Sequence, residues 1–287
     1  MSYFGGAIKK SEVYDIAVLG IPFDEKSSYL RGPAKGPQAI REASTEEELN
    51  PWTELGVNLE KQVTMVDLGD MDVAGPFSGL FERIEDRVFS LLGKRIVPII
   101  LGGDHSISLP VVRAFARAYK PLDILHFDAH PDLYGELYGD RYSHGCPFTR
   151  ILEEGLVDNL VQVGVRSITG EHRERAAAYG VRMIEMKSMP ESLKLMFENP
   201  LYISFDIDAL DPAFAPGVSH REPGGLSTRQ AIDILQTLEA HIVGMDVVEV
   251  NPDRDVSGIT ASAASKIIFE VSGKIALELI SRTDEPG

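Results

Sequence analysis

The sequence is poor in cysteine, with Cys146 alone among 287 residues. One cysteine excludes an intrachain disulfide, which is typical of a reducing compartment. The chain also has no apolar run near the roughly 20 residues that a bilayer span needs, and residues 1–15 lack the apolar core of a signal peptide. Together these absences predict a cytoplasmic protein. We interpret Cys146 as a packing residue.

Basic residues are scarce relative to acidic ones, with 28 Lys and Arg against 44 Asp and Glu and a formal net charge of −16. This balance disfavours nucleic acid and anionic membranes as partners and favours cations near the surface, although a solvated acidic surface explains most of these charges equally well. Repeats, low-complexity segments and linkers are also missing. We therefore expect a single domain over residues 1–287.

What the sequence does contain is an alternation of short apolar runs and helical patterns, typical of an α/β fold. Several of the apolar runs are almost continuous, which indicates a parallel sheet covered on both faces. A closed barrel and an open doubly wound sheet both fit this pattern. The Gly- and Pro-rich "RGPAKGP" (31–37) is interpreted as an ordered loop, and Ser227 or Thr228 as a helix cap. We expect strands at 15–21, 63–69, 95–102, 122–128, 160–165, 181–186, 201–208 and 242–250, and helices at 78–92, 106–119, 171–179, 227–240 and 260–281.

Acidic and imidazole side chains follow three of the expected strands. In "LDILHFDAHPD" (122–132) they are Asp128, His130 and Asp132, whose spacing places them on one face of an extended chain. Asp206 and Asp208 end another strand, and "DHS" (104–106) follows a third. Each group alone is commonly a cap or turn. Strand ends meet at one edge of a parallel sheet, however, and clustered carboxylates there repel one another unless a multivalent cation compensates them.

The types of donor atom limit which metals the site can bind. Carboxylate and imidazole donors without thiolate favour Mn²⁺, Mg²⁺, Fe or Zn²⁺, and the set is too large for one tetrahedral zinc. It suits two ions that share carboxylates and a water, which is the chemistry of hydrolysis. His126 has the parity of Asp128 and stays open as a further ligand, whereas Asp211 is interpreted as a cap or turn residue.

Four segments in this order resemble the ureohydrolase (arginase–agmatinase) family: "LGGDHS" (101–106), "FDAHPD" (127–132), "SFDIDALDPAFAPG" (204–217) and "MDVVEVNP" (245–252). The resemblance spans roughly residues 15–280. It implies a three-layer α/β/α sandwich with an open, mainly parallel eight-stranded sheet. It also implies a homo-oligomer, either a trimer or a hexamer.

The resemblance further implies two Mn²⁺ ions and a role for each site residue. By motif, His105, Asp128, Asp132 and Asp206 hold one ion, and His130 and Asp208 complete the other. Asp128 and Asp206 bridge the two, and His126 falls outside the set. A metal-bridging hydroxide, oriented by Asp132, attacks the guanidinium carbon of the substrate. Glu249 matches the residue that binds the guanidinium, and His144 matches a mobile histidine that carries a proton to the leaving amine.

The sequence says less about the identity of the substrate than about the metal site. The loop "LYGELYGDRYSHG" (133–145) is acidic and aromatic, where family arginases have Asn, Thr and Ser to hold a carboxylate. This favours agmatine, giving putrescine and urea. In "VSHREPGG" (218–225), which replaces the family's "TGTPEPGG", His220 and Arg221 enter a loop near the site. Arg221 is a candidate clamp for an acidic tail, or a partner of Glu222 or Asp211.

Two kinds of alternative remain open. The same chemistry can serve arginine, N1-aminopropylagmatine, 4-guanidinobutyrate or formimidoylglutamate. The chain can also be a non-catalytic, metal-binding family member that acts as a regulatory or scaffold subunit. The full ligand set with Glu249 and His144 argues against the second kind.

Overall fold

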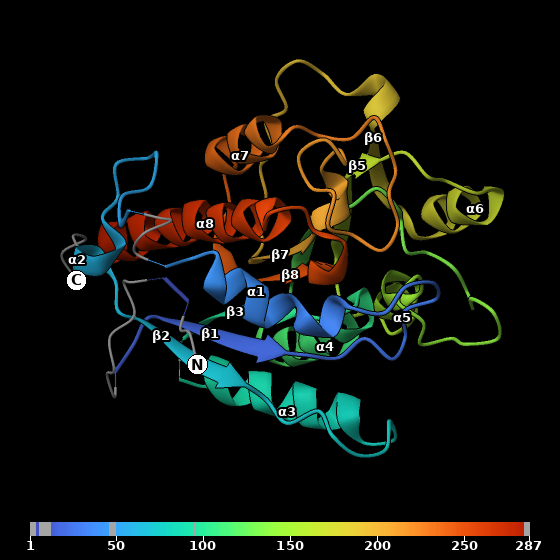
Figure 1. Ribbon diagram of the computed structural model, residues 1–287, viewed down its shortest axis with the longest axis horizontal. Helices are drawn as coiled ribbons and strands as arrows, with labels where there is room; N and C mark the ends of the chain where they lie inside the picture. The colour runs from blue at the N-terminus through green and yellow to red at the C-terminus, as the bar shows by residue number, and fades with distance from the viewer. Residues whose placement is uncertain (1–3, 6–12, 46–49, 95, 284–287) are drawn as a thin grey trace.

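The computed structural model describes residues 4–5, 13–45, 50–94 and 96–283, and it has an eight-stranded sheet at its centre (Figure 1). All strand pairings in the sheet are parallel, and the strand order is β2-β1-β3-β8-β7-β4-β5-β6. The open sheet and the eight expected strands are confirmed. The strands are β1 (Ile16–Ile21), β2 (Met65–Asp70), β3 (Val97–Gly102), β4 (Asp123–Phe127), β5 (Asn159–Val165), β6 (Arg182–Glu185), β7 (Leu201–Asp206) and β8 (Ile242–Val248). Residue 95, where the third strand was expected to begin, lies outside the described residues.

Helices cover both faces of the sheet and make three layers (Figure 1). One face packs against α1, α7 and α8, and the other against α3, α4 and α5. Strand β1 shows why, because Ala17 and Leu19 belong to one buried cluster and Ile16 and Val18 to the other. The helices are α1 (Gly36–Glu42), α2 (Leu59–Gln62), α3 (Leu80–Leu92), α4 (Ser108–Ala118), α5 (Pro147–Glu153), α6 (Gly170–Tyr179), α7 (Thr228–Thr237) and α8 (Ile259–Thr283).

The five expected helices are present, with ends that differ by up to three residues. Ser227 is the N-cap of α7, and its side chain forms a capping box with Gln230. In the described part of the chain, no helix has both the length and the apolar character required to span a bilayer.

The segment "RGPAKGP" is not a loop throughout, contrary to expectation. A 3-10 turn occupies Pro33–Lys35, and α1 begins directly after it at Gly36. Proline is favourable in the first turn of a helix, because its fixed φ suits the helix and its missing N–H is not needed there. Helices α1, α2 and α5 have four to seven residues each. Segments this short carry too little hydrophobic periodicity to be found from sequence.

The sheet order brings four polar strand ends together. The neighbours β3, β8, β7 and β4 occupy the middle of the sheet, and the chain crosses from one half of the sheet to the other between β3 and β4. Open α/β sheets bind ligands outside the carboxyl ends of the strands at such a switch point. The site therefore lies where the fold itself leaves a crevice.

Candidate active site

The predicted metal ligands converge on His105, which begins the 3-10 turn after β3. Its Nδ1 lies 3.0 Å from Oδ2 of Asp132 and 3.3 Å from Oδ2 of both Asp128 and Asp206. These four residues come from the ends of β3, β4 and β7, and each is less than a tenth exposed. They are the set that the resemblance assigned to one ion.

A second group forms around His130. Its Nδ1 lies 3.1 Å from Oδ2 of Asp208 and 3.3 Å from Oδ1 of Asp128. Asp128 therefore presents Oδ2 to His105 and Oδ1 to His130. Asp128 is therefore shared by the two ligand groups, each of which faces a different oxygen of its carboxylate.

The convergence does not arise from an extended strand, as the spacing had suggested. Strand β4 ends at Phe127, and the ligands that follow lie in a loop. Asp132 takes a positive φ of 52° in this loop, a conformation that aspartate tolerates better than most residues. The backbone is further tied to the second group, because the Ala129 N–H donates to Oδ1 of Asp208 at 3.0 Å.

Two features of the ligand cluster favour a cation at its centre. His105 Nδ1 is buried and has no hydrogen-bond partner in the described part of the chain, although three carboxylate oxygens surround it. Burial and the charges of Asp208 and Asp128 raise the pKa of Asp206 well above its usual range, and burial with Asp128 raises the pKa of Asp208 to about 6. Carboxylates this crowded favour a cation among them. Oxygen and imidazole donors suit hard or borderline divalent ions.

His126 lies near the cluster but has no ring nitrogen to spare. Ligand atoms of His105, His126 and Asp128 come within 4.8 Å of one another, so distance alone would include it. Its Nε2, however, is 2.9 Å from Oδ2 of Asp128, and its Nδ1 is 2.9 Å from Nε2 of Gln162. The ring also stacks on Phe148, with centroids 3.9 Å apart. His126 is thus placed to orient Asp128.

A buried hydroxyl and carboxylate also orient His105. Its Nε2 lies 3.0 Å from Oγ of Ser204, which in turn donates to Asp246 at 2.8 Å. Asp246 accepts two more hydroxyl hydrogen bonds, from Ser108 and Tyr202. With Nε2 engaged, Nδ1 of His105 faces the carboxylates.

Glu249 follows β8 and completes the floor of the site. It has a positive φ of 64°, which is unusual for a glutamate, so the surrounding structure must hold it there. Its Oε1 accepts hydrogen bonds from the backbone N–H of His105 and from Nδ1 of His144, both at 3.0 Å. Its Oε2 is buried and has no hydrogen-bond partner among the residues that the structure describes. That oxygen is available to a planar cation such as a guanidinium.

His144 is buried between Glu249 and the loop after β1. Burial lowers its pKa, but the hydrogen bond to Glu249 and the charge of that carboxylate outweigh burial and raise the pKa of His144 to about 9. Burial likewise opposes ionisation of Glu249, but its bond to His144 brings the pKa of Glu249 below the usual value. Proton donor and carboxylate therefore form a charged pair beside the cluster of predicted metal ligands.

A cavity of about 240 Å³ opens from the cluster, lined by both ligand groups, His144 and Glu249. Other lining residues include Ser28, Tyr134, Tyr138, His220 and Glu222. Sequence reasoning did not identify Ser28 or Glu222 as pocket residues. Serines in a loop and a glutamate before proline carry no spacing that marks a site.

The charged residues that the sequence suggested for binding the substrate tail do not line the cavity. Arg221 donates to the carbonyls of Pro216 and Arg254 and does not line the cavity. Asp140 pairs with Lys26 at 2.8 Å, and Glu136 is exposed. The acidic character of loop 133–145 is therefore not presented to the cavity.

The arginase family model matches residues 14–273 of the chain. "Arginase 1, mitochondrial" of Arabidopsis thaliana is 45% identical, with 91% of this chain and 81% of the relative covered. An agmatinase of Neisseria gonorrhoeae is 38% identical, with 90% and 86% covered. The solved structure of an arginase from Medicago truncatula has a TM-score of 0.84 at 42% identity, with 91% and 88% covered. The chain therefore belongs to the arginase family and is a ureohydrolase that acts on guanidino C–N bonds.

Proposed function

We propose that the protein releases urea from a guanidino substrate whose tail carries a free amine, with L-arginine as the first candidate and agmatine as the second. One observation carries the proposal. Glu222, whose Oε1 lies 3.8 Å from Nε2 of His130, lines the cavity, and among the described residues no lysine or arginine lines it. Such a wall can bind an ammonium group through its carboxylate. It provides no positive charge to bind a substrate tail that ends in a carboxylate alone.

The order of the two candidates rests on the rest of the wall. Ser167 lines the cavity and offers a neutral hydroxyl to the carboxylate of an amino acid, while Glu222 can accept its amine. The relative named arginase is also more similar to this chain than the one named agmatinase, 45% against 38%. The sequence argument for agmatine relied on acids in loop 133–145, and these face away from the cavity.

We also propose that two Mn²⁺ ions are bound by the residues that the motifs indicated. His105, Asp128, Asp132 and Asp206 would hold one, and His130 and Asp208 would complete the other. When bound, such ions supply Lewis-acid polarisation and a nucleophilic water at neutral pH.

The protein's own side chains do the remaining work. The free Oε2 of Glu249 accepts guanidinium N–H groups and holds the plane of the substrate against the metal cluster. His144 gives a proton to the leaving amine, since its raised pKa keeps it protonated near neutral pH. A leaving amine needs that proton because an amide anion is a very poor leaving group.

The test is urea release by the Mn²⁺-loaded protein with L-arginine, agmatine, N1-aminopropylagmatine and 4-guanidinobutyrate compared side by side, together with formamide release from formimidoylglutamate. We expect the highest kcat/KM with arginine and the next highest with agmatine. A preference for agmatine would reverse the order of the candidates. A preference for 4-guanidinobutyrate, whose tail has a carboxylate and no amine, would overturn the proposal.

A matched pair of variants locates the tail. Glu222→Gln should raise KM for arginine and agmatine about 10-fold and change kcat less, because it removes the negative charge that pairs with the amine. Arg221→Gln should change neither, since this neighbouring residue points away from the cavity. An effect of Arg221→Gln as large as that of Glu222→Gln would contradict the assignment.

A further inference from the structure

Both ring nitrogens of His144 are engaged. Nδ1 lies 3.0 Å from Oε1 of Glu249, and Nε2 lies 2.8 Å from Oγ of Ser28. Because an ionised carboxylate only accepts, the proton of the neutral ring sits on Nδ1, and Nε2 then accepts from the Ser28 hydroxyl. When the ring is protonated, Nε2 donates to the same Oγ. The contact with Ser28 therefore persists in both protonation states, and the ring does not have to rotate between them.

Ser28 belongs to loop 24–31, which hydrogen bonds and an ion pair hold close to the site. The Lys26 N–H donates to buried Asp104 at 2.8 Å, and the Lys26 carbonyl accepts from the backbone N–H of His144 at 3.2 Å. The ammonium of Lys26 pairs with Asp140 and lies over the ring of Phe77. These contacts come from several parts of the chain, so the position of Ser28 relative to His144 is set by the fold.

The imidazole of His144 is also packed on the cavity side. The ring of His220 lies against it, with centroids 5.3 Å apart and planes inclined by 31°. Tyr29, next to Ser28 in the loop, contacts the same His220 ring at 5.6 Å. His144 thus has a carboxylate on one edge, a hydroxyl on the other and a ring against its face.

We infer that Ser28 is the positioning residue of His144: it holds the ring with Nε2 at the cavity, and the Nε2 proton exchanges the Ser28 hydroxyl for the leaving amine as its acceptor when the proton is transferred. The inference rests on the proposed function for the role of His144. The resemblance implies a mobile histidine at this position, and in the structure each nitrogen of this ring has a hydrogen-bond partner. Ser28 acts through His144 and is not itself assigned to the reacting atoms.

The chain offers a matched control in the adjacent serine. The Ser27 hydroxyl is buried and has no hydrogen-bond partner among the described residues. Ser28→Ala and Ser27→Ala therefore remove the same atom from neighbouring positions of one loop. Ser28→Thr retains the hydroxyl and serves as the rescue variant.

We expect Ser28→Ala to lower kcat for urea release about 10- to 100-fold with KM changed less than about threefold, because a lost hydrogen bond to a charged group has this magnitude and the substrate contacts remain. Ser27→Ala should stay within about twofold of the natural protein, and Ser28→Thr should recover most of the rate. Equal losses in Ser28→Ala and Ser27→Ala would indicate a general effect on the loop and would overturn the inference.

A second measurement does not depend on turnover. Diethyl pyrocarbonate modifies unprotonated imidazole nitrogens, and peptide mass spectrometry reports the rate at each histidine of the Mn²⁺-loaded protein. We expect His144 to react at least about fivefold faster in Ser28→Ala than in the natural protein or Ser27→Ala, because Nε2 is released. An unchanged rate at His144 together with an unchanged kcat would refute the positioning role.

The two measurements separate this inference from the proposed function. If the natural protein releases urea from none of the guanidines, the proposed function fails. The rates at His144 then still decide whether Ser28 holds that ring, since they require no substrate.

Discussion

At the residue scale, Asp128 is the ligand that contacts the histidines of both ligand groups. Its Oδ2 lies near His105 and His126, and its Oδ1 lies near His130. The ligand type was predictable from "FDAHPD", because the residue type alone determines which donor atom a side chain offers. The bridging position was implied by the resemblance, and its contacts depend on two other strands. Loss of the Asp128 carboxylate should therefore weaken the binding of both proposed ions.

Asp128→Asn should abolish both metal retention and urea release. The amide has no charge and only one acceptor oxygen, so neither ion keeps its shared ligand, and Mn²⁺ affinity should fall more than about 100-fold. Metal content after gel filtration and urea formation measure the two effects. The control is Asp123→Asn at the opposite end of β4, where the carboxylate accepts from the side chains of Asn159 and Asn199. An active, metal-free Asp128→Asn protein would disprove the assignment.

Cys146 should be chemically inert in the folded protein. Burial, with the charge of Asp132 adding to it, raises the pKa of its thiol to about 12, and the side chain is fully buried. Since the thiolate is the reactive form, iodoacetamide at about pH 8.5 should label the unfolded chain and leave the native protein unlabelled. Mass spectrometry checks this, and fast native labelling would contradict it. The result would also support the interpretation of Cys146 as a packing residue.

At the scale of elements, sequence reasoning found each strand and each long helix because their periodicity extends over many residues. It missed α1, α2 and α5, and it treated 128–132 as extended chain. Residues in this segment bend because the loop is tied to Asp208 and to the strand end of β5. Those partners are distant in sequence, so local patterns do not report them.

Packing between a strand and a helix gives a prediction of its own. Gly244 in β8 lies against α4, where an added Cβ would be 2.3 Å from Cζ of Phe115 and 3.1 Å from the Pro98 carbonyl oxygen. Gly244→Ala should therefore lower the free energy of unfolding by about 1–3 kcal/mol. The midpoint of urea unfolding measures the loss.

The cause can be isolated with a double variant. Adding Phe115→Leu to Gly244→Ala should recover part of the lost stability, because the main clash is removed. Gly170→Ala is the control, since a Cβ there meets nothing within 4 Å. Additive effects of Gly244→Ala and Phe115→Leu would argue against the clash with Phe115.

At the scale of the whole molecule, the metal cluster joins β3, β4 and β7, and Glu249 adds β8. Removing the ions should leave mutually repelling carboxylates where these strands meet. We expect chelation to lower Tm by about 5–10 °C, which corresponds to a few kcal/mol of binding energy. Added Mn²⁺ should restore Tm in the natural protein but not in Asp128→Asn. A Tm that does not respond to metal would be inconsistent with this account.

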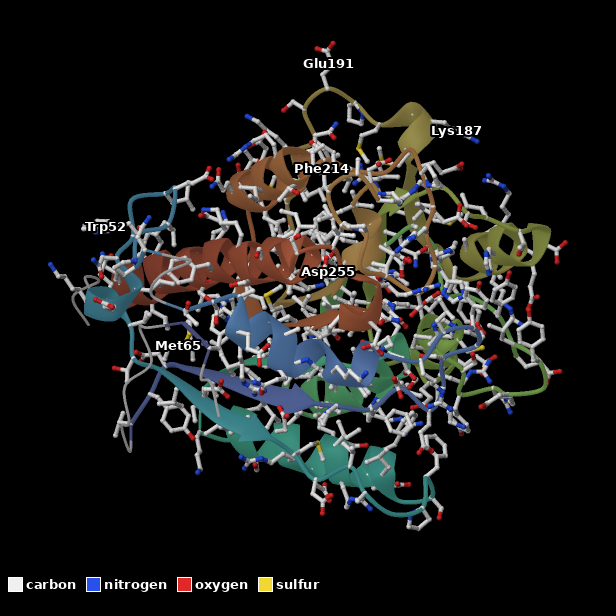
Figure 2. All side chains as sticks on the ribbon, viewed as in Figure 1. Trp52, Met65, Lys187, Glu191, Phe214 and Asp255 are labelled. Atoms are coloured by element: carbon white, nitrogen blue, oxygen red, sulfur yellow. The ribbon has the colours of Figure 1, made fainter. Side chains whose placement is uncertain are left out.

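The resemblance also predicts a homo-oligomer, and the surface shows apolar side chains that association could cover. Trp52, which lies at one edge of the molecule (Figure 2), is 53% exposed, and Met196 is 71% exposed. Light scattering after gel filtration should give three or six times the chain mass of 31.5 kDa. A monomer at micromolar concentration would contradict the prediction.

The sequence by itself determined the alternation of strands and helices, the donor chemistry of the metal ligands and the class of reaction, because periodicity and residue type are local properties. Tertiary structure alone decided which strand ends are neighbours and which side chains reach the cavity. Ser28 meets His144 across 116 residues, and Glu222 enters the wall while Arg221 turns to backbone carbonyls. Such contacts depend on strand order and loop path, which bring together residues that share no pattern along the chain.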